Sequence, residues 1–387
     1  MGENLDKPIT KKVSLDGENE IIKYGISEMQ GYKKSVELFT LKNLVLINQN
    51  KNLCLFGLFD GHNGPEISKY LSLNFSKYLT ENQNFINNDY KLALTETFLK
   101  IDNSFKDINV HKELSKYTSK ITPNFPELNL IENETQNISK FVGIFDPRNL
   151  VEAKIPDFCG SCGLVVLIAD KTVFIANAGN SRCIPINTKD EIMKDKINKE
   201  HIINDKDEIK RMKEAYGLIS INKELEDDQS DDDEEEDIEY AIENKLKPRE
   251  FLPLLVTRGF GNMKYKNIKY FKDVDQYISA EPEIIEIPLE DLNYLIICNS
   301  AVLEENKNNQ ITNYFLDKIK SDENKKISTI IEDYFDEIII KNDKKEENDK
   351  KEVEEEEEKE DDRVINNMAC IIIKFKHNNN EVIEGNN

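Results

Sequence analysis

The feature that most constrains the fold is an apolar run, Leu53 to Phe59, which ends abruptly in the segment Asp60 to Gly64. The run has the length and apolar content of a buried strand. The two glycines of the following segment permit turns that bulkier residues resist, so the strand is expected to end tightly. Asp60 offers a hard oxygen ligand, the Gly61 carbonyl offers a second one, and His62 titrates near neutral pH. The segment predicts a metal site at the end of a core strand, with a local cap of the turn as the alternative.

Other segments show the periodicities of regular secondary structure. Strands rich in Val, Ile, Leu and Phe are expected at 44–48, 53–59, 163–168, 172–176, 294–298 and 368–375. The turn-compatible pair Asp170-Lys171 joins the third and fourth of these into a hairpin. Helices are expected at 65–79 and 90–105, where apolar residues recur every three to four positions, and shorter ones at 205–215 and 311–319. This order indicates helices packed outside antiparallel sheets.

The formal net charge of -23 is concentrated in two acidic segments. Residues 224–239 contain 12 acidic and no basic side chains, and residues 341–362 contain 13 acidic and 6 basic ones, which leaves about -4 for the rest of the chain. Few of these side chains can bury apolar area, so both segments are expected to be solvated, disordered loops. Docking to a basic partner, or phosphorylation at Ser230, is the functional alternative.

The composition argues against several classes of function. An acidic chain without a basic stripe would be repelled by the phosphates of a nucleic acid. No apolar run approaches the roughly 20 residues of a membrane-spanning helix, and the N-terminus lacks the regions of a signal peptide. The six cysteines lie mostly in apolar runs, as free thiols of a reducing compartment do, and Cys159 and Cys162 have no second pair to complete a zinc site. A cytoplasmic protein is expected, with the nucleus as the alternative.

Further segments carry a resemblance to a known family. They are Ser27 to Lys33, Gly160 to Gly163, Ala176 to Arg182, Thr257 to Asn262 and Glu281 to Ile284, which together with Asp60 to Gly64 follow one another in the family's order. Through these segments and their order, the chain resembles the metal-dependent serine/threonine protein phosphatases of type 2C over residues 20–376. The resemblance implies an α+β fold, a four-layer α-β-β-α sandwich of two antiparallel sheets flanked by helices.

The same resemblance sets the expected domain organisation. A single phosphatase-like domain is expected at 20–376, between an N-terminal tail at 1–19 and a C-terminal tail at 377–387. Three insertions interrupt it, at about 106–158, 222–246 and 341–362. The first is an Asn-rich stretch longer than a simple connection, and the other two are the acidic segments.

Enzymes of the resembled family use two Mg²⁺ or Mn²⁺ ions that share an aspartate and bridge the attacking water, so several carboxylates are needed to hold both ions. The resemblance assigns Glu37, Asp60 and the Gly61 carbonyl to one ion. It assigns Asp60 and the positions of Asn299 and Asn366 to the other. The family has aspartates at those two positions, whereas this chain has neutral amides.

Further departures from the family weaken the same reaction. Asn180 stands where the family has an aspartate that supports an additional ion, and Leu38 where it has an aspartate bonded to metal-bound water. Lys33 replaces the phosphate-binding arginine, which keeps the charge but loses the planar fork that grips phosphate. His62 would be the general acid in an active enzyme. Its alternative role is that of a turn histidine hydrogen-bonded to a carboxylate such as Glu37 or Asp60.

The remaining histidines and arginines are expected to be structural. His201 is expected to cap the helix that follows it, and Arg211 and Arg258 to form ion pairs. His111 and His377 lie in polar surroundings without evident partners.

These observations lead to a hypothesis about function. Because asparagine keeps the volume of aspartate and removes its charge, the fold is expected to survive the loss of the bimetallic centre. The alternative is that the low-complexity sequence has been misaligned with the family motifs. The matching apolar strands around Asn299 and Asn366 argue against it. We therefore expect a monomeric pseudophosphatase with at most one tightly bound Mg or Mn ion. It would act by binding a phosphoprotein or a partner kinase or phosphatase, without nucleic acid or membrane.

Two other functions remain open. One is a weakly active Mg/Mn-dependent phosphatase of phosphoserine and phosphothreonine, with a second ion held through the asparagine oxygens. The other is a scaffold whose acidic insertions recruit basic partners.

Overall fold

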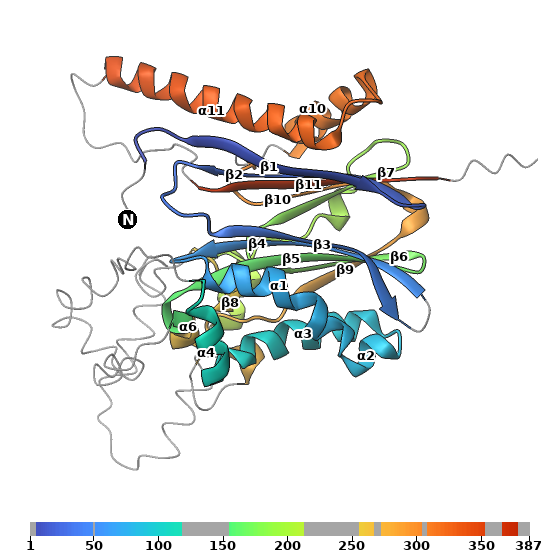
Figure 1. Cartoon of the computed structure of the whole chain (residues 1–387), viewed down its shortest axis with the longest axis vertical. Coiled ribbons are helices and arrows are strands. Elements are labelled where there is room, and N and C mark those ends of the chain that lie inside the picture. Colours follow the sequence, from blue (N-terminus) through green and yellow to red (C-terminus); the bar gives the residue numbers. More distant parts are fainter. Residues whose placement is uncertain are drawn as a thin grey trace, which may run out of the picture.

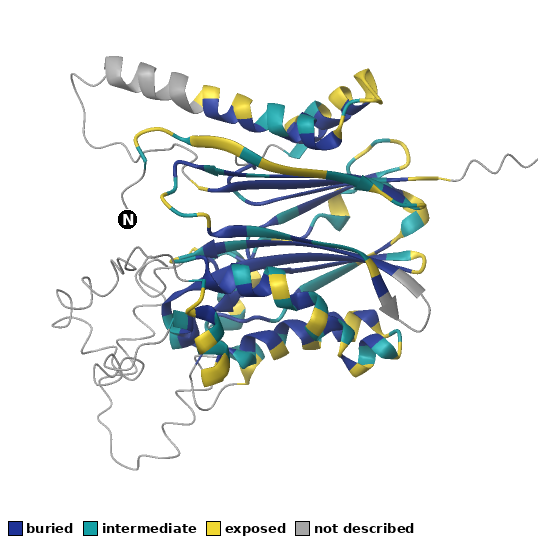
Figure 2. Cartoon of the chain, in the orientation of Figure 1, coloured by how far each residue is buried: buried dark blue, intermediate teal, exposed yellow. Residues whose placement is uncertain are grey.

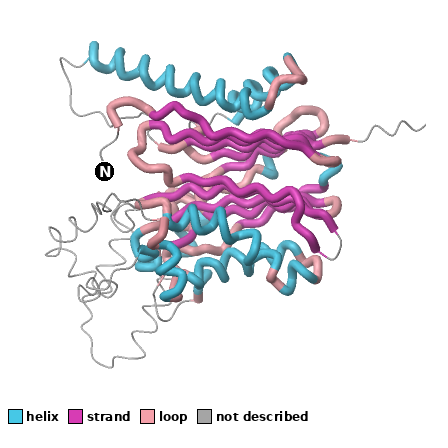
Figure 3. Tube along the Cα trace, viewed as in Figure 1, coloured by secondary structure: helices cyan, strands magenta, loops and turns pink. Residues whose placement is uncertain are grey.

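The computed structural model describes residues 5–48, 51–117, 155–212, 255–266, 272–303, 308–352 and 366–377. Two antiparallel sheets stack face to face, and helices cover the outer side of each (Figure 1). The strands between the two helical layers are mostly buried (Figure 2), and the tube in Figure 3 shows the order helix, strand, strand, helix through the molecule. This is the four-layer α+β fold that the resemblance implied. None of the helices described is long and apolar enough to span a membrane.

The first sheet has five strands in the order β1-β2-β11-β10-β7. Their bounds are β1 Ile9–Glu18, β2 Ile22–Gly31, β7 Arg182–Asn187, β10 Leu292–Cys298 and β11 Met368–Phe375. Strand β11, which has the bounds predicted for it, lies in the centre. Its residue Cys370 is opposite Ser27 of β2 on one side and Cys298 of β10 on the other. The last described strand therefore joins the two ends of the chain.

The second sheet has the order β3-β4-β5-β6-β9, with β8 beside β5. Their bounds are β3 Leu38–Asn48, β4 Lys51–His62, β5 Gly160–Ala169, β6 Thr172–Ala178, β8 Phe260–Gly261 and β9 Glu283–Pro288. The predicted hairpin is confirmed, because β5 and β6 pair antiparallel and Asp170 between them has a left-handed φ of 54°. Asp60 of β4 lies opposite Leu38 of β3 and Cys162 of β5. The predicted site segment thus ends a strand that has a neighbour on both sides.

Helices form the two outer layers (Figure 1). The layer on the second sheet contains α1 Glu66–Thr80, α2 Gln83–Ile86, α3 Tyr90–Ser104, α4 Ile108–Leu114 and α6 Ile155–Phe158, and the layer on the first sheet contains α10 Asn308–Ser321 and α11 Ile327–Glu352. Short 3-10 turns occur at Lys194–Lys196, Met263–Tyr265, Asp273–Asp275 and Leu289–Asp291. Residues 206–212 form a further helical segment, so the helix expected at 205–215 is described as far as 212.

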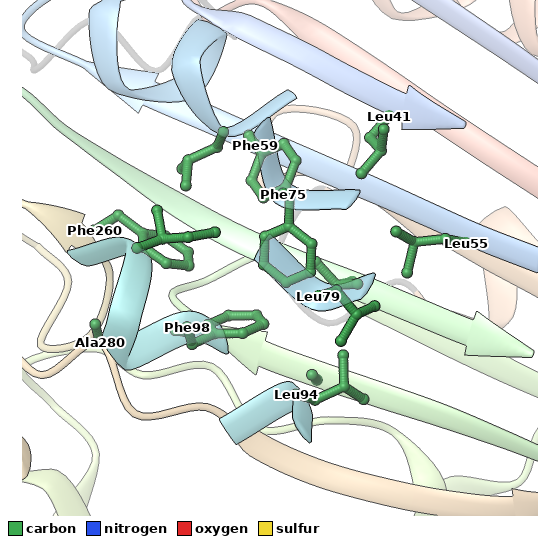
Figure 4. Close-up of a cluster of buried hydrophobic side chains, with 14 of the residues drawn as sticks. Leu41, Leu55, Phe59, Phe75, Leu79, Leu94, Phe98, Phe260 and Ala280 are labelled. Carbon is green, nitrogen blue, oxygen red and sulfur yellow. The ribbon is translucent and has the colours of Figure 1, made fainter. Parts of the chain in front are cut away.

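Apolar side chains fill each space between layers. Beneath the second sheet, Phe75 of α1 contacts Phe59 of β4 and Phe98 of α3, with ring centroids 5.8 and 5.3 Å apart (Figure 4). Between the sheets, the rings of Tyr24 and Phe56 meet edge to face at 5.3 Å. Burial of such large aromatic side chains is a major favourable term in folding.

Several expectations about the domain limits need correction. Residues 9–18, placed in an N-terminal tail at 1–19, form β1, which pairs along its length with β2. The insertion expected at 106–158 begins with α4 and ends with α6. Its residues 118–154, the acidic segment at 222–246 and the tail residues 378–387 lie outside the described residues.

Helix α11 was not predicted, and it changes the interpretation of the second acidic segment. Its backbone continues to Glu352, so residues 341–352 are helical rather than a loop, while 353–362 lie outside the described residues. Lys and Glu are good helix formers, so they extend a helix that is already anchored. The anchor is a row of buried side chains against the first sheet, formed by Ile327, Ile330, Ile331, Phe335, Ile338 and Ile339.

Candidate active site

The residues singled out in the sequence meet where β4 ends and β3 begins. The N–H of Gly61 donates to the carbonyl of Glu37 at 3.0 Å, and the hydroxyl of Ser68 at the start of α1 donates to the same carbonyl. A Cβ atom at Gly61 would overlap this carbonyl, so the close approach of the two segments requires glycine. Glu37 and Asp60 are therefore held beside each other by backbone contacts.

Asn299, the residue directly after β10, contacts Asp60. Its Nδ2 donates to Asp60 Oδ2 at 3.1 Å. The same Nδ2 donates to the carbonyl of Asn367 at 2.8 Å, and Oδ1 accepts the N–H of Ala369 at 3.1 Å. Because a backbone N–H only donates and a carbonyl only accepts, these two contacts determine which end of the amide faces Asp60. Asn299 therefore presents N–H, and not oxygen, to the carboxylate.

Glu37 has a protein donor on each carboxylate oxygen. Oε2 accepts the ammonium of Lys33 at 2.7 Å, and Oε1 accepts the hydroxyl of Ser35 at 2.8 Å. The Glu37 side chain is largely buried, so this pairing matters more than it would at an exposed surface. Lys33, expected as a phosphate contact, forms an ion pair with Glu37 in the structure.

Burial dominates the electrostatics of Asp60. Burial raises the pKa of Asp60 to about 6, against the lowering effects of the hydrogen bond from Asn299 and the charge of Lys33, and Glu37 raises it further. Opposite Asp60, burial raises the pKa of the Cys162 thiol to about 12, and the charge of Asp60 adds to the effect. A thiol with such a pKa stays neutral and is a poor nucleophile.

His62 contacts a side chain that the sequence did not indicate as its partner. Its Nε2 lies 2.7 Å from Nδ2 of Asn262, so the amide donates and the imidazole proton is placed on Nδ1. Asn262 has a left-handed φ of 51°, and both side chains pack against Gly160, where a Cβ atom would overlap them. Sequence reasoning missed this role of Asn262, although its segment had been matched to the family.

The other two asparagines in expected ligand positions differ in their surroundings. Asn180 accepts the thiol of Cys162 through Oδ1, with sulfur and oxygen 3.3 Å apart, which places it near Asp60. Asn366 is exposed, and the next residue makes the buried contacts. Asn367 donates to the carbonyls of Gln30 and Ser35 and accepts the N–H of Glu37 at 2.8 Å. The structural role of Asn367 was not predicted.

Both arginines expected to be structural are confirmed as ion-pair formers. Arg258 and Arg211 contact Glu208 at 2.7 and 3.1 Å. Burial raises the pKa of Glu208, but these contacts outweigh it and lower the pKa to about 2.

Two histidine expectations need correction. His201 does not cap the helix that follows, because Asp205 accepts the N–H groups of Asp207 and Glu208 there. Instead Nδ1 of His201 accepts the N–H of Gly179 at 3.3 Å. His111 has a partner, since its Nε2 contacts the carbonyl of Phe105.

The donor set does not fit a centre of two divalent ions. Within the described ranges, no three or more His, Cys, Asp or Glu side chains are grouped so that they could hold a metal ion. Glu37, Asp60 and the Gly61 carbonyl supply oxygen atoms. However, Lys33 and Ser35 donate hydrogen bonds to Glu37, and an N–H of Asn299 donates to Asp60. Two ions would bring four positive charges to two carboxylates.

Comparisons with known proteins agree with the fold. The family model described as protein phosphatase 2C matches residues 22–122 and 111–342. Probable protein phosphatase 2C 6 of Paramecium tetraurelia is 26% identical over 342 residues, which cover 88% of this chain and 94% of that protein. Probable protein phosphatase 2C 21 of Arabidopsis thaliana is 24% identical over 353 residues, which cover 88% and 87% of the two chains.

Solved structures share the architecture at low sequence identity. The serine-threonine phosphatase 2C from Toxoplasma gondii aligns with a TM-score of 0.54 at 12% identity, covering 95% of this chain and 99% of that chain. A second phosphatase from Toxoplasma gondii aligns with a TM-score of 0.56 at 14% identity, covering 94% and 96%. With the family model matching most of its length, the chain belongs to the protein phosphatase 2C family.

Proposed function

We propose that this chain is a pseudophosphatase of the type 2C family, which retains the fold and acts by binding a protein or phosphoprotein. The observation that carries the proposal is the orientation of Asn299, whose N–H faces Asp60 where the family has an aspartate oxygen. A divalent cation at that position would meet an N–H dipole of the wrong sign. Turning the amide over would leave the N–H of Ala369 without its acceptor and the carbonyl of Asn367 without its donor.

The Lys33 to Glu37 contact supports the same proposal. An ammonium 2.7 Å from Oε2 supplies within the chain a positive charge that a metal would otherwise bring. The charges of Lys33 and Glu37 then neutralise each other without a metal ion. The contact also makes Lys33 less available to phosphate, so recognition of a partner is assigned to the protein surface as well as to this site.

We assign at most one tightly bound Mg²⁺ or Mn²⁺ to the site, with Glu37, Asp60 and the Gly61 carbonyl as its ligands. Binding it would require Lys33 to release Glu37. A cytoplasmic or nuclear location fits this proposal, because all six cysteines are free and buried, as in proteins of reducing compartments.

A weakly active phosphatase is the second candidate, favoured by the retention of Asp60, Gly61 and His62 at the end of β4. It requires the second ion to bind through asparagine oxygens. The orientation of Asn299 argues against this, since its Oδ1 accepts Ala369 N–H.

Calorimetric titration with Mn²⁺ tests the proposal on the whole chain. Wild type is expected to bind no more than one ion per chain with measurable affinity, and Asp60→Ala to bind none at this site. Asn299→Asp combined with Asn366→Asp is expected to add a second ion. Two tightly bound ions in the wild type, both lost in Asp60→Ala, would contradict the proposal and support the active enzyme.

A further inference from the structure

Strand β1 is a sheet edge with exposed apolar side chains. In the described part of the first sheet it pairs with β2 on one side, and its other edge has no strand neighbour. Val13 is 66% exposed, Leu15 44% and Ile9 42%. In Figure 2 this strand, next to α11, has mostly the colour of exposed residues. An ordered edge strand of this kind is a template for pairing with another strand.

The neighbouring edge of the second sheet is protected in a way that β1 is not. On β3, the N–H and the hydroxyl of Thr40 both donate to Glu28 Oε1, at 2.7 and 2.6 Å. An inward-pointing charge of this kind blocks strand addition. At the opposite end of the first sheet, Ile186 of β7 forms a bridge with Ile192. Among these edges, β1 is therefore the one best suited to receive a strand.

The side chains of β1 divide between two faces. Lys12 contacts Asp336 of α11, and Asp16 accepts the N–H of Ser328 at 2.9 Å, so the even-numbered residues face the helix. Val13 and Leu15 lie on the other face because side chains alternate along a strand. Leu15 is opposite Ile26, which is buried between the sheets.

We propose that β1 pairs antiparallel with β1 of a second copy of this chain, about a two-fold axis at Ser14. In this register Val13 of each copy lies opposite Leu15 of the other, and Lys12 lies opposite Asp16. In this register, apolar side chains lie opposite apolar ones and a positive charge lies opposite a negative one, so the segment is complementary to a second copy of itself. Opposite residues of paired strands have Cβ atoms about 4.5–5.5 Å apart, close enough for both kinds of contact.

The register is specific. Slipping by one residue places Val13 opposite Ser14 or Asp16 and mixes the two faces, which is unfavourable when one face is apolar. The irregular pairing between Ile9 and Lys12 limits the regular segment at one end. Two five-stranded sheets would become one continuous sheet across the dimer. Because only a short segment pairs, the dimer is expected to be weak, and it replaces the monomer expected from the sequence.

Sedimentation velocity of the full chain over a wide concentration range tests the dimer. Wild type is expected to shift from monomer to dimer as concentration rises. Val13→Lys combined with Leu15→Lys places like charges near one another and is expected to weaken the dimer at least tenfold. Val45→Lys is the matched control, because Val45 is 57% exposed on β3, and it should leave the dimer unchanged. A wild type that stays monomeric throughout, or an equal dimer in the double variant, would overturn the proposal.

Cross-linking tests the register independently. Ser14→Cys places two thiols opposite each other on the axis, and mild oxidation should join them as a disulfide-linked dimer. Lys11→Cys, which lies off the axis, should cross-link much less. The native cysteines are buried and provide the background, measured in the wild type. Equal cross-linking at positions 11 and 14 would contradict this register.

Discussion

The amide of Asn299 donates to the carboxylate of Asp60 at 3.1 Å, across two sheets that come together at the site. Asp60 lies near the end of β4 in the second sheet, while Asn299 follows β10 of the first. The contact therefore joins the two halves of the sandwich at the position to which the family resemblance assigns a metal ion. In this chain the two sheets are joined there by a hydrogen bond between two side chains.

Replacing Asn299 by aspartate should destabilise the metal-free protein. Asn299→Asp would place a second carboxylate beside Asp60 and against the carbonyl of Asn367, which now accepts an N–H. We expect a loss of about 1–3 kcal/mol in the free energy of unfolding, measured by urea denaturation with EDTA. Mn²⁺ should recover part of it. Unchanged stability with EDTA would mean that the observed hydrogen bonds contribute little.

Removing the ammonium of Lys33 should free Glu37 for a metal. Lys33→Met is expected to raise the affinity for Mn²⁺ about tenfold, equivalent to about 1.4 kcal/mol, because the competing cation is gone. Lys33→Arg should retain the low affinity, and Lys189→Met at an exposed turn is the control. Calorimetry measures all three. An affinity that does not change in Lys33→Met would show that the ion pair does not compete with metal.

The packing of His62 and Asn262 against Gly160 predicts a coupled pair of substitutions. Gly160→Ala adds a methyl group that would overlap the side chains of His62 and Asn262. The substitution should lower the free energy of unfolding by about 1–3 kcal/mol. In an Asn262→Ala background the same change should cost less, because one of the overlapping side chains is removed. Urea unfolding of the four proteins gives the coupling energy. Strictly additive effects would contradict the packing described.

The free energy of unfolding should decrease as the pH is lowered, because His201 does not take up a proton in the folded state. Burial, with a smaller effect from the charge of Arg258, lowers the pKa of His201 to about 4 from its ordinary value of 6.5. Between these values the unfolded chain binds the proton and the folded chain does not, so protonation favours unfolding as pH decreases. The loss should approach about 3 kcal/mol between pH 6.5 and 4.

His201→Gln should flatten this dependence, and His377→Gln, at an exposed position, should not. Chemical denaturation at a series of pH values measures both. Equal slopes in wild type and His201→Gln would contradict the assignment.

The sequence predicted the elements whose pattern is unambiguous. The strand at 368–375 is a continuous apolar run and was placed with its observed bounds. Helix α11 was missed because its charged half has the composition of a disordered segment, and only its contacts with the first sheet reveal the anchor. Strand β1 was missed because its exposed edge lacks the apolar content of a core strand.

The sequence indicated some residues of the candidate site but not the geometry of their contacts. The family resemblance identified Asp60 and Asn299, which the structure brings together. The direction of the Asn299 amide depends on the backbone of Asn367 and Ala369, about 70 positions away, and no local pattern encodes it. Likewise, the spacing of Lys33 and Glu37 outside a helix gives no indication that the two charges meet.

The most direct test of the pseudophosphatase account is turnover of a phosphothreonine peptide with millimolar Mn²⁺, measured for wild type beside Asp60→Ala. The account predicts that the two proteins release phosphate at the same background rate. Turnover in the wild type that disappears in Asp60→Ala would contradict it, and would show that Asn299 does not prevent assembly of a working metal centre.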